Sequence, residues 1–214
     1  MKFDKQTLII AALAIAGFAG GIGVNWYADR PRQQTGGQEI AGLLWPNPRS
    51  VTGVNLIDQD GKPFTDSNLQ GQWSLVFFGF TRCPDVCPTT MSVLKDAFAQ
   101  MQRDPTQPLP RVIFISVDPE RDTPEILNSY VGFFDRSFVG LTGNMQNVTA
   151  LTRSLGIVYM KVPLEGDDYT VDHSAAILLL DPQARIVGLL SPPHTSADII
   201  SSVRQIQHFV TTAR

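Results

Sequence analysis

Residues 73–91 read WSLVFFGFTRCPDVCPTTM and carry the clearest signal of a buried strand followed by a helix. The first part, Trp73–Phe80, is a continuous apolar run, which is typical of a central strand buried on both faces of a sheet. Two cysteines, Cys83 and Cys87, follow in a short loop, and Pro88 fits the first turn of a helix. An apolar stripe with spacings of three, four and three predicts that helix, and it consists of Met91, Leu94, Phe98 and Met101. The cysteines therefore lie at the carboxyl end of a strand, where open α/β sheets place their chemistry.

Strand-like and helix-like stretches alternate over the rest of the chain. Further strands are predicted at Arg111–Val117, Phe138–Leu141, Ile157–Val162, Ala175–Leu180 and Arg185–Leu190, the last two as a hairpin. Apolar stripes predict three further helices. The first follows the cap Thr123, and its stripe is Ile126, Leu127, Tyr130, Phe133 and Phe134. The second has the stripe Val148, Leu151 and Leu155 and ends at Gly156, and the third begins at about Thr195 with the stripe Ile199, Val203, Ile206 and Val210. This order predicts an α/β fold, a thioredoxin-like sandwich around a central mixed sheet.

The N-terminal segment is apolar, since residues 7–27 carry no charge and end in Trp26 and Tyr27. About 20 apolar residues span a bilayer, so the segment predicts one N-terminal transmembrane helix; the alternative is a cleaved signal peptide, whose apolar region is usually shorter. The basic residues before and after the segment are balanced and do not fix its orientation. The predicted organisation is an anchor over 1–28, a spacer rich in Pro, Gly and Gln over 29–50, and one domain over 51–214.

The composition limits the classes of function. The formal net charge is −3, the pI is near 5.5 and there is no basic cluster, which argues against a nucleic-acid partner. The two cysteines lie four positions apart, whereas a disulfide scaffold would use more cysteines, spread along the chain. The pair is interpreted as a redox couple or a metal site. A purely structural disulfide fits poorly with a proline-flanked pair in a strand-to-helix loop.

The cysteine loop has two chemical outcomes. Cys87 lies near the positive end of the predicted helix, which favours a thiolate. The two sulfurs can bond to each other, or both can bind a soft cation such as copper(I), for which an imidazole is a suitable third ligand. Of the three histidines, His194 and His208 are expected at the surface. His173 stands immediately before a predicted strand, and the sequence by itself does not bring it to the cysteines.

Several carboxylates lie near these motifs. Asp85, between the cysteines, is interpreted either as a group that tunes the thiolates or as a turn residue. Asp172 could accept the second N–H of the imidazole of His173, as carboxylates commonly do beside metal ligands. Residues 118–122 (DPERD) carry hard ligands that suit copper(I) poorly, so a loop and helix-cap role is expected there. The acidic segment 164–169 is expected to be a solvated loop that could also dock a basic partner.

These motifs together resemble the Sco (SenC-type) family of copper chaperones for cytochrome oxidase assembly. The matching blocks are 78–91 (FGFTRCPDVCPTTM), 114–124 (FISVDPERDTP) and 169–175 (YTVDHSA). The resemblance implies a copper ion bound by Cys83, Cys87 and His173. It implies an inner-membrane protein whose domain faces the bacterial periplasm or the mitochondrial intermembrane space. The implied partner is the copper-A centre of cytochrome c oxidase subunit II, or another copper-carrying protein, which receives copper or has its cysteines reduced.

Two enzymatic hypotheses stand beside the metallochaperone. A thiol–disulfide oxidoreductase would use Cys83 or Cys87 as the attacking thiolate and would have no obligatory need for His173. A peroxidase of the peroxiredoxin type would carry a PxxxTxxC pattern. Here position 77 is Phe and Thr81 lies two residues before Cys83, so the peroxidase hypothesis is disfavoured.

Overall fold

The computed structural model describes residues 42–166 and 168–212. The predicted transmembrane segment, 7–27, and most of the predicted spacer lie outside the described residues. None of the helices within the described ranges has the length and apolarity needed to cross a bilayer.

The main sheet has eight strands in the order β1-β10-β9-β4-β5-β6-β2-β3. Its strands are β1 (Gly42–Ser50), β2 (Asn55–Asp58), β3 (Pro63–Thr65), β4 (Ser74–Gly79), β5 (Arg111–Ser116), β6 (Val139–Thr142), β9 (Ile177–Leu180) and β10 (Arg185–Leu190). Strands β4, β5 and β6 run parallel, while β9 pairs antiparallel with β4 and with β10. All six residues of β4 are buried, as the continuous apolar run predicts. The predicted mixed sheet and the hairpin β9–β10 are confirmed.

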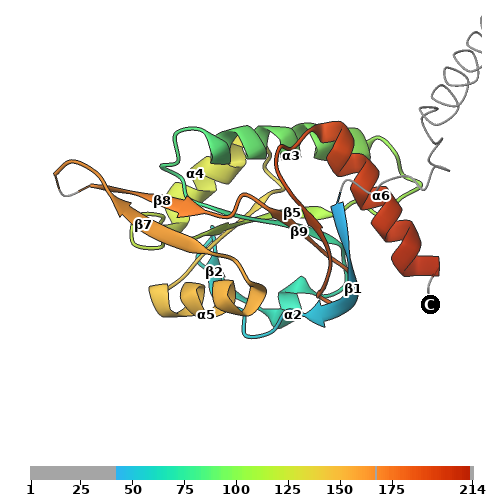
Figure 1. Cartoon of the computed structure of the whole chain (residues 1–214), viewed down its shortest axis with the longest axis horizontal. Helices are drawn as coiled ribbons and strands as arrows, with labels where there is room; N and C mark the ends of the chain where they lie inside the picture. Colours follow the sequence, from blue (N-terminus) through green and yellow to red (C-terminus); the bar gives the residue numbers. More distant parts are fainter. Residues whose placement is uncertain (1–41, 167, 213–214) are drawn as a thin grey trace, which may run out of the picture. The chain divides into compact units, whose positions relative to one another are not determined.

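Helices cover both faces of this sheet. They are α2 (Asp66–Leu69), α3 (Val86–Gln102), α4 (Pro124–Phe134), α5 (Met145–Leu155) and α6 (Ser196–Thr212). Helices α3, α4 and α6 lie on one side of the sheet, and α2 and α5 lie on the other (Figure 1). Strand β4 leads through the cysteine loop into α3, so both cysteines lie at one end of the central strands.

The predicted end signals of α4 and α5 are confirmed, but the predicted stripe of α4 is partly wrong. The Thr123 side chain accepts from the Ile126 N–H, and Gly156 ends α5 in the left-handed conformation, with φ 72°. Ile126 and Phe133 are 41% and 78% exposed. The buried face of α4 follows the spacing i, i+4, i+7 through Leu127, Val131 and Phe134, and neighbouring positions turn away by about 100°.

Strand β1 forms within the segment predicted to be a spacer. It pairs antiparallel with β10, from Gly42 opposite Leu190 to Ser50 opposite Arg185, and the register shifts between Leu44 and Arg49. Pro46 and Pro48 fall inside that irregularity. Proline has no N–H to donate, so it is tolerated on an edge strand or at a bulge, and it masks the pattern of a strand.

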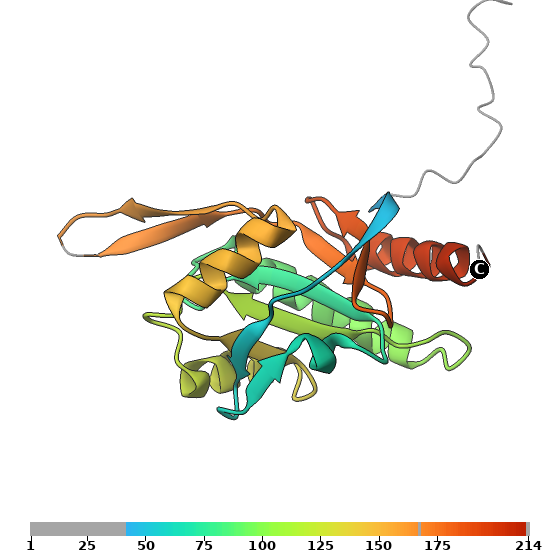
Figure 2. The ribbon, with the colours of Figure 1, turned by 90° about the horizontal axis from the view of Figure 1, so that it is seen from below.

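A second, two-stranded sheet is formed by β7 (Tyr159–Pro163) and β8 (Tyr169–His173), which pair antiparallel. This hairpin projects from the body of the domain (Figures 1 and 2). Strand β7 was predicted, and the acidic segment supplies the turn, but β8 was not predicted. Its sequence YTVDH is short and mixes polar with apolar residues, so it carries little strand signal.

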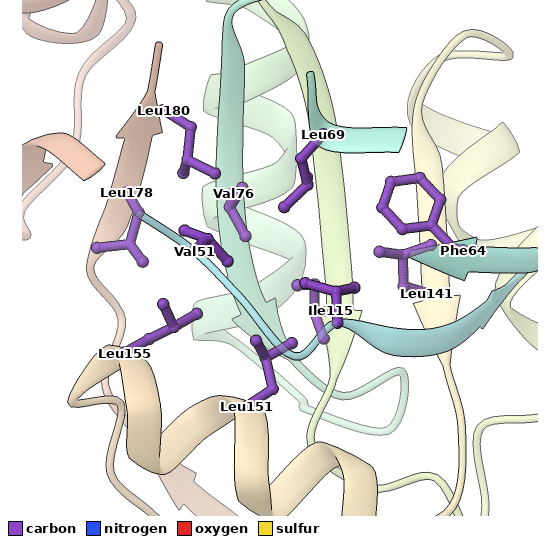
Figure 3. Close-up of a pocket in the computed structure, with 11 residues that line it drawn as sticks. Val51, Phe64, Leu69, Val76, Ile115, Leu141, Leu151, Leu155, Leu178 and Leu180 are labelled. Carbon is purple, nitrogen blue, oxygen red and sulfur yellow. The ribbon is translucent and has the colours of Figure 1, made fainter. Parts of the chain in front are cut away.

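One small void lies in the core on the side of the sheet that α5 covers (Figure 3). Its volume is about 10 Å³, and apolar side chains line it: Val51, Val54, Phe64, Leu69, Val76, Ile115, Leu141, Leu151, Leu155, Leu178 and Leu180. A void of this size has room for about one water, and an apolar lining offers that water no hydrogen-bond partner. The void is a packing defect of the core and offers no chemistry for a ligand.

Candidate metal centre

The two cysteines occupy the turn between β4 and α3. Cys87 is the second residue of α3 and is fully buried, whereas Cys83 lies in the preceding loop and is half-buried. The Cys87 N–H donates to the Sγ of Cys83 at 3.4 Å, and both thiols are free. The sequence predicts this placement at the carboxyl end of a central strand.

Gly79 makes room for the buried thiol. A Cβ atom at this position would lie 2.8 Å from the Sγ of Cys87 and 2.8 Å from the Cε2 of Phe114. Both contacts are shorter than packed carbon and sulfur atoms tolerate, and the ring of Phe114 belongs to the core. The glycine therefore lets the thiol of Cys87 approach β4 closely. Sequence analysis missed this role because a glycine in a strand does not reveal what approaches it.

His173, the last residue of β8, reaches the cysteines from the projecting hairpin. Its Nε2 lies 3.2 Å from the Sγ of Cys87. The Nδ1–H donates to the Ser174 carbonyl at 3.0 Å, which leaves the lone pair on Nε2 facing the thiols. The imidazole also packs edge-on against Phe77 and Phe80, with ring centroids 6.0 Å apart in both pairs.

The ligand atoms of Cys83, Cys87 and His173 all lie within 4.8 Å of one another, so these side chains could together hold a metal ion. Two sulfurs and one imidazole form a soft donor set that suits copper(I). A structural zinc site closes with four ligands. Among the described residues, no fourth His, Cys, Asp or Glu joins these three, so a structural zinc site would be incomplete here.

Burial controls the protonation of the site. Burial raises the pKa of the Cys87 thiol far above its usual value, and the neighbouring Cys83 raises it further. The sequence predicts that the helix N-terminus favours a thiolate at Cys87, and burial of the thiol acts in the opposite direction. Burial lowers the pKa of His173, which favours the neutral imidazole that a metal requires. A bound cation would offset the charge of two thiolates, so metal binding would release protons.

The loop 118–122 ties the cysteine loop to the end of β5. Asp122 is fully buried and accepts hydrogen bonds from Thr81 N–H (3.1 Å), Thr81 Oγ1 (2.6 Å) and Ser116 Oγ (2.6 Å). Thr81 lies two residues before Cys83, so this carboxylate fixes the start of the cysteine loop. The carboxylate is a cross-link between elements, which goes beyond the loop and cap role expected from the sequence.

The same loop also holds the hairpin that carries His173. Asp118, fully buried, accepts from the Arg121 Nε and from the Tyr169 hydroxyl, the latter at 2.7 Å. Arg121 in turn donates to the Tyr169 carbonyl at 2.9 Å and to Asp168 at 3.0 Å. Its guanidinium carbon lies 3.7 Å from the centroid of the Tyr169 ring. The sequence analysis does not predict these contacts. Its one signal for them is that Asp118 and Arg121, of opposite charge, lie three residues apart.

The structure revises the predictions for the remaining polar residues. Asp172 is exposed, and the imidazole N–H that it was expected to bind donates to Ser174 instead, so that prediction is wrong. His194 is half-buried and contacts the Ala175 carbonyl through Nε2 at 2.8 Å, contrary to the expected surface position. His208 is exposed, as predicted. Asp85 is exposed just before α3 and accepts from Thr89 Oγ1 at 3.4 Å, which fits a turn role.

The site is open to solvent on one side. A surface pocket borders it and is lined by two segments, Phe80 and Cys83–Val86 from the cysteine loop and Thr170–His173 with Ala175 from the end of the hairpin. Val86, at the rim, is 45% exposed. The half-buried Cys83 faces this pocket, so a reacting group from another molecule can approach it.

Comparisons with known proteins agree on one family. The family model described as SCO1/SenC matches residues 48–208. The mitochondrial SCO2 homolog of Mus musculus is 34% identical over 203 residues, which cover 94% of this chain and 78% of that protein. The copper-bound structure of ScoI from Arabidopsis thaliana is 35% identical, with a TM-score of 0.68, over 75% of this chain and 96% of that chain.

A further solved structure is that of BsSco, a member of the Sco family of cytochrome c oxidase assembly proteins with a disulfide switch. It is 26% identical to this chain, with a TM-score of 0.61, over 78% of this chain and 98% of that chain. These likenesses confirm the thioredoxin-like fold that the order of strands and helices predicts.

Proposed function

The chain belongs to the SCO1/SenC family, and we propose that it is a copper chaperone that holds one copper ion between Cys83, Cys87 and His173. The observation that carries the proposal is the meeting of two thiols and one imidazole within 4.8 Å. Support also comes from a relative, the ScoI of Arabidopsis thaliana, whose structure contains copper. The ion is the cargo of this site, which binds and releases it.

The geometry suits transfer of the ion. Three ligands leave the copper incompletely enclosed, so a ligand from a partner can add before one of the three departs. Cys83 is half-buried and borders the open pocket, whereas Cys87 is fully buried. In the proposed transfer, a partner thiolate therefore replaces Cys83 first, and Cys87 releases the copper last.

We propose that the recipient is the copper-A centre of cytochrome c oxidase subunit II. Membership of the family and the relationship to BsSco, an oxidase assembly protein, support this recipient. We further propose that the segment 1–28 is a membrane anchor and 29–50 a spacer. The domain over 51–214, to which strand β1 adds an edge, would then face the periplasm or the mitochondrial intermembrane space.

A second candidate function is thiol–disulfide exchange. The Cys87 N–H already donates to the Sγ of Cys83, so the two sulfurs are neighbours in the free-thiol state. Oxidation of this pair would reduce a disulfide of the partner, with two electrons passing to the partner and two thiol protons released or transferred. This activity requires both cysteines and no histidine ligand.

One experiment separates the two functions. The copper(I)-loaded protein is mixed anaerobically with a reduced, metal-free copper-A domain, the two proteins are separated, and the copper bound to the acceptor is measured. We expect wild type to build the centre and His173→Ala, which keeps both thiols, to build it with a much lower yield. A second arm presents the disulfide form of the acceptor without copper. If His173→Ala matches wild type in copper transfer, the three-ligand chaperone is wrong and thiol exchange becomes the better account.

A further inference from the structure

We propose that Asp118, Arg121 and Tyr169, here called the hairpin clamp, are positioning residues that determine how firmly His173 holds the copper. This inference rests on the proposed copper function. It concerns residues that do not touch the metal and act through the hairpin on which His173 lies.

The clamp joins the loop after β5 to the start of β8. The carboxylate of Asp118 accepts from Arg121 Nε and from the Tyr169 hydroxyl, while Arg121 donates back to the Tyr169 carbonyl. The guanidinium also stacks on the Tyr169 ring, with Lys161 of β7 at 4.5 Å from the same ring centroid. Lys161 in addition donates to Glu120 at 2.6 Å. Backbone, ring and hydroxyl of one hairpin residue are thus all held by a single loop.

Burial makes the clamp stronger than a surface ion pair. The side chain of Asp118 is fully buried and that of Arg121 is 13% exposed, whereas exposed pairs contribute little because water competes for them. Removing one partner of such a buried pair leaves an uncompensated charge. The pair of Asp118 and Arg121 therefore strongly favours the arrangement in which the hairpin packs against the loop 118–122. The hairpin projects from the domain (Figure 2), and the contacts of Tyr169 with the loop 118–122 fix it where β8 begins.

The clamp acts on the imidazole because both lie on the same strand. Tyr169 and His173 are the first and last residues of β8, about 13 Å apart at the usual rise of a strand. The thiols do not depend on this strand, because Asp122, at the other end of the loop 118–122, fixes the cysteine loop through Thr81. Loss of the clamp would therefore loosen His173 and leave the two sulfurs in place.

Other contacts keep the hairpin attached when the clamp is broken. The Tyr159 hydroxyl bonds with Thr149 of α5 at 2.8 Å, and Val171 is buried in the core. Tyr159 is paired with His173 in the register of the hairpin. The expected effect is consequently a weaker third ligand in a folded protein.

The test uses the full chain with Arg121→Met, the milder Tyr169→Phe, and Arg153→Met as a control at an exposed arginine of α5. Copper(I) is loaded anaerobically, and its transfer to an excess of chelator gives the dissociation rate. Loss of a partner that bonds directly to a metal ligand commonly costs 10–100-fold in affinity, and Arg121 acts on His173 only through the strand, so we expect Arg121→Met to release copper roughly 10 times faster. For Tyr169→Phe, which loses one hydrogen bond, we expect roughly fivefold, and for Arg153→Met no change.

A second readout separates positioning from general destabilisation. X-ray absorption of the copper-loaded Arg121→Met protein should show two sulfur ligands with the nitrogen weakened or lost. In a His173→Ala background, Arg121→Met should have no further effect on the release rate, because the residue through which it acts is gone. An equal effect of Arg121→Met with and without His173 would overturn the clamp proposal, and so would wild-type release rates in both clamp variants.

A copper-independent readout keeps this inference distinct from the proposed function. In the metal-free protein, amide hydrogen exchange along β7 and β8 should be faster in Arg121→Met than in wild type or Arg153→Met. If wild type bound no copper, the proposed function would be wrong. Unchanged exchange in Arg121→Met would by itself overturn the clamp.

Discussion

The Nε2 atom of His173 lies 3.2 Å from the Sγ atom of Cys87, although 86 positions separate the two residues. Cys87 is held in the first turn of α3, and His173 is held at the end of the projecting strand β8. The cysteine loop that leads into α3 and the strand β8 are attached separately to the loop 118–122, through Thr81 and Tyr169 respectively. The thiol pair and the imidazole can therefore be disturbed separately by mutation, which makes the following predictions specific.

Replacing Gly79 by Ala should displace the Cys87 thiol. The new Cβ would lie 2.8 Å from that sulfur and from the Phe114 ring, and overpacking of this kind typically costs about 1–3 kcal/mol. The free energy of unfolding from urea titrations and the copper affinity should both fall. The matched control is Gly132→Ala in α4, where a Cβ meets nothing within 4 Å and a gain of about 1 kcal/mol is expected. Equal stability of the two variants would contradict the packing role of Gly79.

Replacing Asp122 by Asn should release the start of the cysteine loop. The carboxylate accepts three hydrogen bonds from donors of Thr81 and Ser116, and an amide turns an N–H₂ group toward one of them. We expect a loss of about 2–3 kcal/mol in the free energy of unfolding, the size seen when a buried donor is left unpaired. Asp96→Asn, at an exposed position of α3, should change it by less than about 0.5 kcal/mol. If both variants unfold at the same urea concentration, the cross-link is not important for stability.

The two adjacent phenylalanines of α4 should differ sharply. Phe134 is 6% exposed and packs against Tyr130 with ring centroids 5.3 Å apart, whereas Phe133 is 78% exposed. Phe134→Ala should lower the free energy of unfolding by about 3–5 kcal/mol, and Phe133→Ala by about 0.5 kcal/mol or less. Chemical denaturation measures both. A large loss of unfolding free energy in Phe133→Ala would mean that Phe133 is buried after all, as the predicted apolar stripe of α4 implies.

Copper should stabilise the folded protein in proportion to its affinity. At a free copper(I) concentration of 100 times Kd, binding to the native state contributes about 2.7 kcal/mol, less any binding to the unfolded thiols. For a domain of this size we expect Tm to rise by about 5–10 °C and to return when a chelator removes the metal. Calorimetry under anaerobic conditions tests this. An unchanged Tm at saturating copper would mean that the native site binds copper no more tightly than the unfolded thiols do.

The sequence predicts the central part of the fold well, because strong local patterns specify it. The buried run of β4, the stripe of α3 and the cysteine pair between them are confirmed. Strand β1 was missed because its prolines hide the pairing, and β8 because its five residues carry little pattern.

The surroundings of the site are harder to predict from one chain. The approach of His173 to the cysteines was inferred from the resemblance alone, since the contact depends on how a hairpin folds back. The role of Gly79 depends on a sulfur from another element, and those of Asp118 and Asp122 depend on donors 51 and 41 positions away, respectively. Long-range contacts of this kind leave no local period in the sequence.

Anaerobic titration of copper(I) against a competing chelator shows whether His173 is a ligand of the copper ion. It compares wild type, His173→Ala, and His208→Ala as a control at an exposed histidine of α6. A three-ligand copper site predicts one copper per chain in wild type, the same affinity in His208→Ala, and in His173→Ala an affinity weaker by at least the roughly 10–100-fold that loss of a ligand's supporting partner costs. Equal affinities in wild type and His173→Ala would contradict it, because the imidazole beside Cys87 would then not be a copper ligand.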